Sequence, residues 1–386
     1  MTQTRIYLDW NATAPLRPEA RAAMTAAWDV VGNPSSVHAE GRAARRLVED
    51  ARAIVARATG TSARNVVFTS GGTEANALAL APGLRRPGSE PVQRLVLSAV
   101  EHPSVLAGGS FDDTDIVKAP VDAEGVVNLE RLHDLLRDGP PTLVSVMLAN
   151  NETGAIQPIP AIAGIVHEAG GILHVDAVQA LSRISCDMNE LSADILSISA
   201  HKVGGPKGIG ALIVRDDVAG LDPLIRGGGQ EKGRRAGTEN VPGIIGFGAA
   251  LDVAMERTGV ESGRIEALRG RLEAGLANEP GTVIFSRETA RLPNTTLAAV
   301  PGMKAETAVI GFDLAGIAVS SGSACSSGKV QPSHVLAAMG VPVELARGAI
   351  RISLGWNTSE SDVDRFLQTW RTLAGTLGNK MIRTGA

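Results

Sequence analysis

Residues 171–202 read GILHVDAVQALSRISCDMNELSADILSISAHK. The apolar runs at 171–175 and 194–199 are typical of buried β-strands, and the segment between them is long enough for a crossover connection. Asp176 follows the first run and Lys202 follows the second. Ligands of open α/β sheets bind beyond the carboxyl ends of the strands, so this stretch predicts a parallel sheet with a binding site at that edge.

The same pattern extends on both sides of this stretch. Residues 17–30 and 38–59 carry apolar residues at helical spacing. Short apolar runs then alternate with helix-like segments such as 159–169. The remaining candidate strands lie at residues 65–69, 94–98, 143–148 and 210–214. This order predicts an α/β fold in which a mostly parallel sheet is covered by helices on both faces.

The pattern of elements changes near residue 260. A charged helix is followed by short strands, with further helices between and after them. We expect these elements at residues 262–277, 283–286, 295–300, near Thr307, at 350–353 and at 360–373. They predict a second, smaller α+β domain.

Composition narrows the class of protein. At about 150 residues per domain, a chain of 386 residues forms roughly two to three domains. The net charge of −4 gives no general attraction to nucleic acid or anionic lipid. The 6 Phe, 4 Trp and 1 Tyr offer little surface for stacking on bases. We therefore expect small molecules and other proteins as partners, and no nucleic acid.

Membrane, secretion and metal signals are weak in this sequence. The longest uncharged apolar stretch, 241–251, is shorter than the about 20 residues that cross a bilayer, and the N-terminus has no apolar segment typical of a signal peptide. We expect a cytoplasmic protein with no membrane partner. The two cysteines, Cys186 and Cys325, lie far apart and outside any metal-binding spacing, so neither a disulfide framework nor a metal site is expected.

A glycine-rich segment, Ser70-Gly71-Gly72-Thr73-Glu74, follows the candidate strand at 65–69. Small residues at a helix N-terminus let backbone N–H groups and the Thr73 hydroxyl approach a phosphate. The segment matches neither the dinucleotide fingerprint nor the P-loop. A glycine turn with Thr73 as the helix N-cap explains the same residues.

Three further residues stand after candidate strands. His102 can stack on a ring or move protons, or it can cap a helix. Asp176 needs a cationic partner, such as a pyridinium nitrogen, if it is buried, or it caps the next helix. Lys202 can form a Schiff base if it is desolvated, or it is a solvated surface charge. Together with the glycine-rich segment, these residues supply the groups that a protein needs to bind pyridoxal 5'-phosphate.

The chain resembles the cysteine desulfurases from about Tyr7 to Trp370. These enzymes belong to the class V aminotransferase branch of the fold-type I pyridoxal-phosphate enzymes. The segments that carry the resemblance are residues 8–9 with 11–13, 32–36, 69–74, 101–103, 150–152, 174–179, 199–202, 227–240 and 320–326.

This resemblance implies two domains. The large domain, residues 16–259, would bind the cofactor on a mostly parallel seven-stranded sheet between helices. The smaller α+β domain would combine residues 1–15 with 260–386 and carry a catalytic cysteine loop.

The resemblance also implies roles around the cofactor. Lys202 would hold pyridoxal phosphate through its amino group, His102 would stack on the pyridine ring, and Asp176 would pair with the ring nitrogen. Gln179 would contact the phenolic oxygen. The cofactor-binding residues expected nearer the phosphate are Gly72, Thr73, Ser199 and His201. Thr238 would reach the phosphate of a neighbouring subunit, which implies an obligate homodimer.

For the substrate, the resemblance implies that Arg351 grips the carboxylate and that Asn151 helps to position substrate and cofactor. A guanidinium suits a carboxylate because it can donate two parallel hydrogen bonds.

Cys325 decides the predicted reaction. It lies in a run of small residues, 320–328, which would let a thiol move between cofactor and acceptor. From the residues alone, a small core cysteine is an equal alternative. The resemblance implies that Cys325 acts with Lys202 and His102 in catalysis and takes sulfur from L-cysteine as a persulfide, leaving L-alanine. A sulfur-acceptor protein such as an iron–sulfur scaffold would receive the sulfur, whereas Cys186 is expected to be structural.

Two other functions fit the same sequence. One is a related class V enzyme of the same cofactor, such as a selenocysteine lyase. The other is a non-catalytic scaffold in iron–sulfur assembly. The sequence departs from the family at Trp10, where a polar residue is more usual, so the surroundings of the site entrance are expected to differ.

Overall fold

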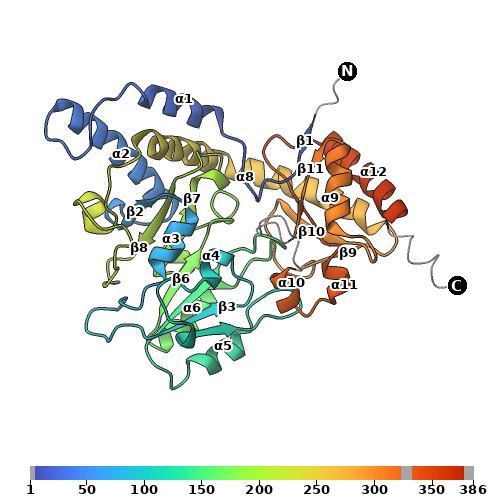
Figure 1. Ribbon diagram of the computed structural model, residues 1–386, viewed down its shortest axis with the longest axis horizontal. Helices are drawn as coiled ribbons and strands as arrows, with labels where there is room; N and C mark the ends of the chain where they lie inside the picture. Colours follow the sequence, from blue (N-terminus) through green and yellow to red (C-terminus); the bar gives the residue numbers. More distant parts are fainter. Residues whose placement is uncertain (1–4, 323–332, 378–386) are drawn as a thin grey trace.

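The computed structural model describes residues 5–322 and 333–377. The chain forms two lobes, one coloured blue to green around the larger sheet and one coloured orange to red (Figure 1). Both lobes contribute to the region around the predicted site.

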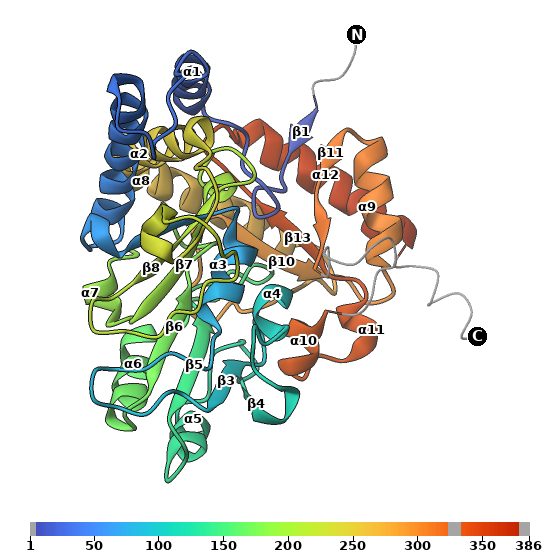
Figure 2. The same cartoon turned by 60° about the vertical axis from the view of Figure 1, so that its left-hand side comes forward.

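The larger sheet has seven strands in the order β2-β8-β7-β6-β5-β3-β4, which can be followed from β8 to β4 in Figure 2. β8 runs antiparallel to both of its neighbours, and the other pairs are parallel. The strands are β2 (Val66–Thr69), β3 (Arg94–Ser98), β4 (Ile116–Ala119), β5 (Thr142–Met147), β6 (Ile172–Asp176), β7 (Ile195–Ser199) and β8 (Gly210–Val214). The predicted mostly parallel seven-stranded sheet is confirmed.

Helices cover both faces of this sheet. Val66 and Phe68 of β2 belong to one apolar cluster, together with residues of α2 (Ala39–Ala58), α6 (Ile159–Glu168) and α8 (Val241–Ala277). Val67, between them, belongs to a second cluster with residues of α3. The helices of this lobe are α1 (Pro18–Ala27), α2 (Ala39–Ala58), α3 (Gly72–Ala79), α4 (Pro103–Leu106), α5 (Leu129–Leu136), α6 (Ile159–Glu168) and α7 (Met188–Leu191). Alternate side chains of the buried strands therefore point to opposite layers.

The sequence pattern did not predict β4. This strand lies at the edge of the sheet and pairs only with β3. Lys118 is exposed and only Ala119 is buried, so the segment lacks the continuous apolar run of the central strands. An edge strand exposes one side to water and can therefore carry charged residues.

The second lobe contains a four-stranded antiparallel sheet, in the order β12-β13-β10-β9, and a parallel pair of β1 with β11. Phe312 stacks on Phe366 in its core, with ring centroids 4.9 Å apart, and Trp370 packs beside them. The elements are β1 (Ile6–Tyr7), β9 (Val283–Ile284), β10 (Thr295–Ala299), α9 (Ala305–Leu314), β11 (Ile317–Ala318), β12 (Ser320–Ser321), α10 (His334–Ala338), α11 (Val343–Ala346), β13 (Ile350–Ser353) and α12 (Glu360–Leu377).

One long helix, α8 (Val241–Ala277), runs from one lobe to the other. Phe247 and Leu251 pack in the core of the larger sheet, whereas Leu268 and Leu272 pack in the core of the second lobe. The charged helix predicted at 262–277 is the second half of this helix. The predicted boundary after residue 259 falls inside α8, and the division into the two stated domains stays a prediction.

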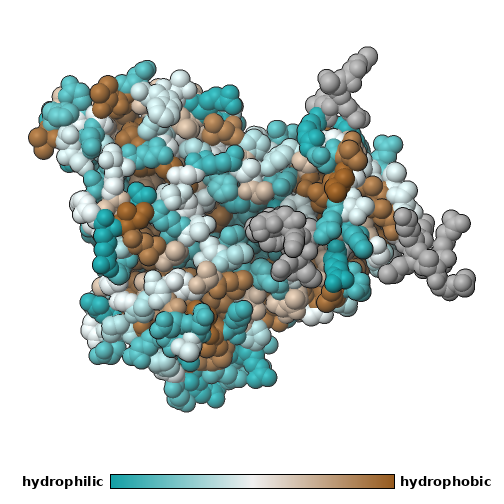
Figure 3. All heavy atoms as spheres, in the orientation of Figure 1, coloured by the Kyte–Doolittle hydropathy of each residue, from teal (hydrophilic) through white to brown (hydrophobic). Residues whose placement is uncertain are grey.

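In the described part of the chain, no helix combines the length and the apolar character that crossing a membrane requires. Figure 3 shows hydrophilic side chains over the whole face drawn, with hydrophobic side chains in separate patches between them.

Two glycines of α8 test how closely this helix packs. A Cβ on Gly248 would lie 2.9 Å from the Cβ of Ala51 in α2, whereas a Cβ on Gly259 would meet no atom within 4 Å. We expect Gly248→Ala to lower the free energy of unfolding by about 1–3 kcal/mol because the helices must move apart. Gly259→Ala should raise it by about 0.5–1 kcal/mol through helix propensity. Urea unfolding of both variants checks this, and equal stability of the two would contradict the close packing.

Candidate active site

A cavity of about 190 Å³ lies where β5, β6 and β7 end. It brings together most of the predicted site residues. The lining residues are Gly72, Thr73, Asn76, His102, Ser104, Met147, Ala149, Asn151, Asp176, Val178, Gln179, Ser199, His201 and Lys202. The expectation that the carboxyl edge of the sheet forms a site is consistent with this placement.

One end of the cavity is formed by the N-terminus of α3. Gly71 is the N-cap residue, with φ 155°, a conformation that side chains rarely adopt, and no side chain in the described part of the chain caps this helix end. The alternative of Thr73 as N-cap is therefore wrong. A Cβ on Gly72 would lie 2.8 Å from Val178 and 3.5 Å from Ser199, so only glycine leaves this space open. Uncapped N–H groups at a helix N-terminus attract an anion.

Ser199 adds an unsatisfied polar group to this end of the cavity. Its Oγ is buried and has no hydrogen-bond partner among the residues that the structure describes. Buried hydroxyl groups are normally hydrogen-bonded, so this oxygen is suited to a ligand. His201 lies nearby in the lining, and its Nδ1 is 3.2 Å from the Thr13 hydroxyl. Burial, followed by the charges of Lys202 and Lys207, lowers the pKa of His201 to about 4, so the ring is neutral at pH 7.

Asp176 is held by its neighbours at the end of β6. Its Oδ2 accepts a hydrogen bond of 2.8 Å from Asn76 in α3, and its Oδ1 accepts one of 2.9 Å from the Val178 N–H. No helix follows Asp176 directly, so the alternative in which it caps the next helix is wrong; its carboxylate accepts from the turn at Val178 instead, and Asp176 lines the cavity. Asp176 as a residue is only 6% exposed, so a cationic ligand group beside its carboxylate would relieve the cost of burying the charge.

His102 combines the two roles that the sequence left open. It is the N-cap of α4, where its Nδ1 accepts from the Ser104 N–H at 3.2 Å, and its ring lines the cavity. Burial lowers the pKa of His102, and Lys202 and His334 lower it further, against the opposing effect of Asp176. The ring is therefore mainly neutral at pH 7 and can exchange a proton.

Lys202 is positioned by the N-terminal segment. It ends a 3₁₀ turn, Ala200–Lys202, which follows β7 directly. Its Nζ donates to the backbone oxygens of Asn11 and Ala12 at 2.5 and 2.9 Å. Gln179 contacts the same segment, because its Nε2 donates to the Asn11 oxygen at 2.9 Å. Lys202 is thus half-buried with its amine held by backbone oxygens, which disfavours the alternative of a freely solvated surface charge.

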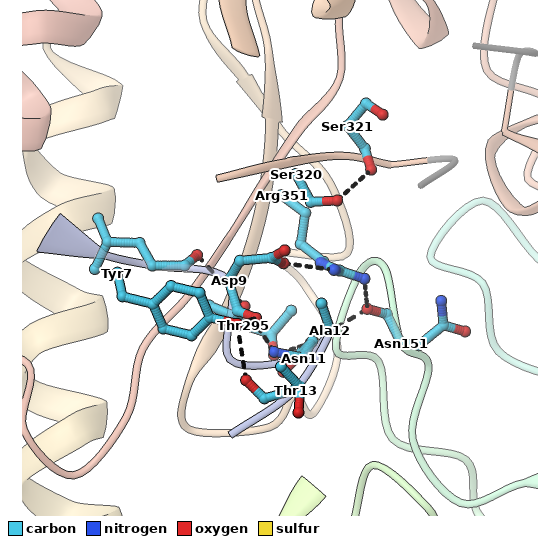
Figure 4. Close-up of polar contacts among 12 residues, drawn as sticks. Tyr7, Asp9, Asn11, Ala12, Thr13, Asn151, Thr295, Ser320, Ser321 and Arg351 are labelled. Carbon is cyan, nitrogen blue, oxygen red and sulfur yellow. Dashed lines mark hydrogen bonds and ion pairs between the residues drawn. The ribbon is translucent and has the colours of Figure 1, made fainter. Parts of the chain in front are cut away.

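Arg351 lies on β13, outside the cavity lining but joined to it through Asn151 (Figure 4). Its Nη1 donates to the Asn151 backbone oxygen at 3.0 Å, and its Nη2 pairs with the Asp9 carboxylate at 2.7 Å. The Nε is buried and, within residues 5–322 and 333–377, has no hydrogen-bond partner. The guanidinium therefore retains donor capacity for a further acceptor.

Two predicted site residues, Thr238 and Cys325, and the second cysteine, Cys186, do not line this cavity in the described part of the chain. Thr238 is exposed and precedes α8, so its predicted contact with a neighbouring subunit stays a prediction. Cys325 lies outside the described residues. Cys186 is 3% exposed, and burial raises the pKa of its thiol to about 12, as a structural cysteine requires. Among the described residues, no cluster of His, Cys, Asp and Glu could hold a metal ion.

Sequence reasoning missed several neighbours of these residues. Asn76 follows Thr73 by three positions, so helical spacing within α3 could have placed both on the same face. Asp9 meets Arg351, and Asn11 meets Lys202, across more than 150 positions of sequence. Only the tertiary fold creates those two contacts.

The comparisons with known proteins agree with this geometry. The family model described as Aminotransferase class-V matches residues 6–366. The chain belongs to the class-V aminotransferase family. It is 44% identical over 372 residues to a cysteine desulfurase of Cereibacter sphaeroides, and the match covers 94% of each chain.

Solved structures show the same relationship. The X-ray structure of a NifS-like protein from Rickettsia africae ESF-5 has a TM-score of 0.87 and 36% identity, covering 96% of this chain and 99% of that one. A structure described as SspA in complex with cysteine has a TM-score of 0.75 and 32% identity, covering 92% and 100%. The predicted resemblance to the cysteine desulfurases and the prediction of an enzyme of this family are confirmed.

Glu101, beside His102, offers a test of the electrostatics behind the cavity. It is fully buried, and burial raises its pKa to about 8, although Ser98 and the Met147 N–H donate to its Oε1. The carboxyl is thus protonated in the folded protein at pH 6–7, whereas in the unfolded chain it ionises near 4.5. Stability from this group is lost as pH rises from about 4.5 to 8.

Glu101→Gln should remove this pH dependence, because the amide is neutral at every pH and keeps an acceptor oxygen. Relative to the variant, the wild type should lose up to about 1.4 kcal/mol of unfolding free energy per pH unit in this range. Urea unfolding at pH 5, 6, 7 and 8 measures the difference. Parallel stability profiles for the two proteins would show that Glu101 is not protonated in the folded state.

Proposed function

We propose that this protein is a pyridoxal-phosphate-dependent cysteine desulfurase, which converts L-cysteine to L-alanine and transfers the sulfur to Cys325. The observation that carries the proposal is the meeting of Lys202, Asp176 and the uncapped N-terminus of α3 in one cavity. Membership of the class-V aminotransferases and the similarity to named cysteine desulfurases support it.

The cavity residues fit pyridoxal phosphate. The phosphate would accept hydrogen bonds from the N-terminus of α3, with Gly72 leaving space, and from the unpartnered Ser199 hydroxyl. Thr73 and His201 line the same cavity. These groups match an anion better than an apolar ligand.

The other end of the cofactor would meet Asp176 and Lys202. The buried Asp176 carboxylate would pair with the pyridinium nitrogen, which it would keep protonated. The Lys202 amine would hold the cofactor covalently, His102 would stack on the ring, and Gln179 would contact the phenolic oxygen. When bound, the cofactor supplies an electron sink for the bond changes at the substrate Cα.

The chain's own residues would position the substrate and move its protons. Arg351 would bind the carboxylate, for which its unpartnered Nε is suited, and Asn151 would orient the amino acid. The Lys202 amine would take the proton from Cα. The neutral His102 ring would exchange a proton near the substrate.

Cys325 would then take the sulfur. Its thiolate attacks the sulfur of the substrate, an S–S bond forms, and the substrate Cβ–S bond breaks. The electron pair of that bond stays with the carbon, which gains a proton to give L-alanine. One thiol of the enzyme becomes a persulfide, so the reaction needs no external oxidant or reductant.

The proposal includes two further predictions of the sequence. The enzyme would act as an obligate homodimer in which Thr238 reaches the phosphate of the neighbouring subunit. In the cytoplasm, the persulfide would pass to an acceptor protein such as an iron–sulfur scaffold.

Cys325→Ala tests the nucleophile. The variant should keep the cofactor absorbance of the wild type, form no persulfide, and lose nearly all alanine production, a fall of about 100-fold or more. Alanine and protein-bound persulfide are measured after addition of L-cysteine to the cofactor-loaded protein. Unchanged sulfur release by the variant would rule out Cys325 as the acceptor. If the wild type makes alanine from selenocysteine but not from L-cysteine, the result would favour a selenocysteine lyase.

Lys202→Ala tests covalent attachment of the cofactor. After borohydride reduction, the intact mass of the wild type should increase by one cofactor, whereas that of the variant should not, because no other lysine lines the cavity among the described residues. An unchanged mass increase in the variant would assign the attachment to another residue.

A further inference from the structure

Arg183 is a cationic side chain beside the candidate active site that has no role in the proposed reaction. It follows Gln179 by four positions, in the turn between β6 and α7. Its Nη1 donates at 2.7 Å to the side-chain oxygen of Gln179 and at 2.9 Å to the backbone oxygen of the same residue. Within the described residues, the Arg183 side chain has no carboxylate partner. Its position is therefore to be explained by what it does to Gln179.

The backbone beneath Arg183 is fixed to α8. The Ser262 hydroxyl donates to the Arg183 backbone oxygen at 3.2 Å, and the Thr258 hydroxyl donates to the Ser182 backbone oxygen at 3.4 Å. Ser182 has a φ of 65°, in the left-handed region that residues other than glycine rarely adopt. Such a conformation persists where the surrounding contacts hold it. The guanidinium therefore reaches Gln179 from an anchored turn.

The two contacts of the Gln179 amide allow only one orientation of its oxygen and nitrogen. A guanidinium donates hydrogen bonds and does not accept them, whereas a backbone oxygen accepts and does not donate. The Gln179 Oε1 therefore faces Arg183, and the Nε2 faces the Asn11 oxygen, to which it donates at 2.9 Å. If the amide were turned over, both hydrogen bonds would be lost. An amide nitrogen carries two N–H groups, and in the described part of the chain only one of them is used.

Several titratable groups lie around the cavity that Gln179 lines. Those in the lining are Asp176, Lys202, His102 and His201, and Arg351 of the second lobe acts on Arg183 through its charge. Burial, followed by the charge of Arg351, lowers the pKa of Arg183 to about 9, so this guanidinium is a cation at pH 7. Because a cationic guanidinium can only donate, the orientation of the Gln179 amide is kept across the neutral pH range.

We propose that Arg183 is a positioning residue for the cofactor: it holds the Gln179 amide with the second N–H directed into the cavity, where that N–H donates to the phenolic oxygen of pyridoxal phosphate. The identity of the cofactor and of this oxygen rests on the proposed function. The orientation of the amide rests on the contacts of Gln179 with Arg183 and Asn11. A donor at the phenolic oxygen stabilises the deprotonated, more negative form of the bound cofactor and so lowers the pKa of the cofactor.

Arg183→Met removes the donor and keeps a side chain of similar length. The Gln179 amide can then rotate, so the pKa of the bound cofactor should rise by about 0.5–1 unit. The measurement is the midpoint pH at which the absorbance band of the cofactor-loaded protein changes in the absence of substrate. Arg183→Lys should restore about half of the shift or more, because one Arg183 nitrogen serves both Gln179 oxygens and an ammonium can do the same.

Gln179→Ala separates positioning from the loss of a positive charge. This variant should itself raise the midpoint pH, because it removes the donor to the phenolic oxygen. In its background, Arg183→Met should add less than about half of the shift that it causes in the wild type, because the two residues act through one amide.

Arg94→Met is the matched control. Arg94, at the start of β3, is also partly exposed, and it donates to the Thr142 hydroxyl at 3.1 Å and to the Leu135 backbone oxygen at 2.8 Å. Neither partner lines the cavity. The midpoint pH of this variant should stay within about 0.2 unit of the wild-type value. If Arg183→Met does not retain the cofactor, Arg183→Gln, which is also uncharged, takes its place in every comparison.

The midpoint needs no substrate, so the test distinguishes this inference from the proposed function. If the variants shift as expected but the wild type makes no alanine from L-cysteine, the proposed reaction fails and the inference stands. If the wild type makes alanine, three results would overturn the inference alone: an unchanged midpoint in Arg183→Met, an equal shift in Arg94→Met, or an undiminished shift in the Gln179→Ala background, which would assign the effect to charge.

Discussion

The hydrogen bonds of residues 8–13 join the two lobes at the cavity, and the arrangement of the site depends on them. The Ser353 N–H donates to the Leu8 oxygen at 2.9 Å, and the Ser353 hydroxyl accepts from the Asn11 N–H at 2.9 Å, which ties the segment to β13. The Asn11 and Ala12 oxygens accept from Lys202, beyond the end of β7. One short segment thus contacts both the lysine that would carry the cofactor and the strand that carries Arg351.

Figure 4 shows the same connection through side chains: Asp9 meets Arg351, and Asn11 approaches the Asn151 oxygen that Arg351 also contacts. A buried guanidinium without a carboxylate partner would be strongly destabilising, so Asp9 fixes Arg351 as well as balancing its charge. Displacing this segment would therefore alter the proposed cofactor site and the proposed substrate site together.

Burial controls the charge of the ionisable groups around the cavity. Burial raises the pKa values of Glu101 and Glu152 and lowers those of His102 and His201, so these four groups tend towards their neutral forms near pH 7. Because these four groups tend to be neutral, they add little buried charge to the proposed site when a phosphate and a carboxylate bind there.

The amino-acid sequence by itself determined the central strands of the larger sheet, because long buried strands need uninterrupted apolar runs and such runs are visible in a single sequence. It also indicated Asp176 and Lys202, because Asp176 ends one strand, Lys202 lies three residues beyond the next, and the carboxyl ends of parallel strands meet at one edge. The sequence pattern missed the edge strand β4, because its partly exposed residues do not form a continuous apolar run. It also missed that α8 is one continuous helix, because the residues it buries change from one core to the other along its length. Only the tertiary structure decided that Asp9 pairs with Arg351 and that Asn11 meets Lys202. These contacts join residues far apart in the chain, and nothing in the local spacing of either partner encodes which distant group it will meet.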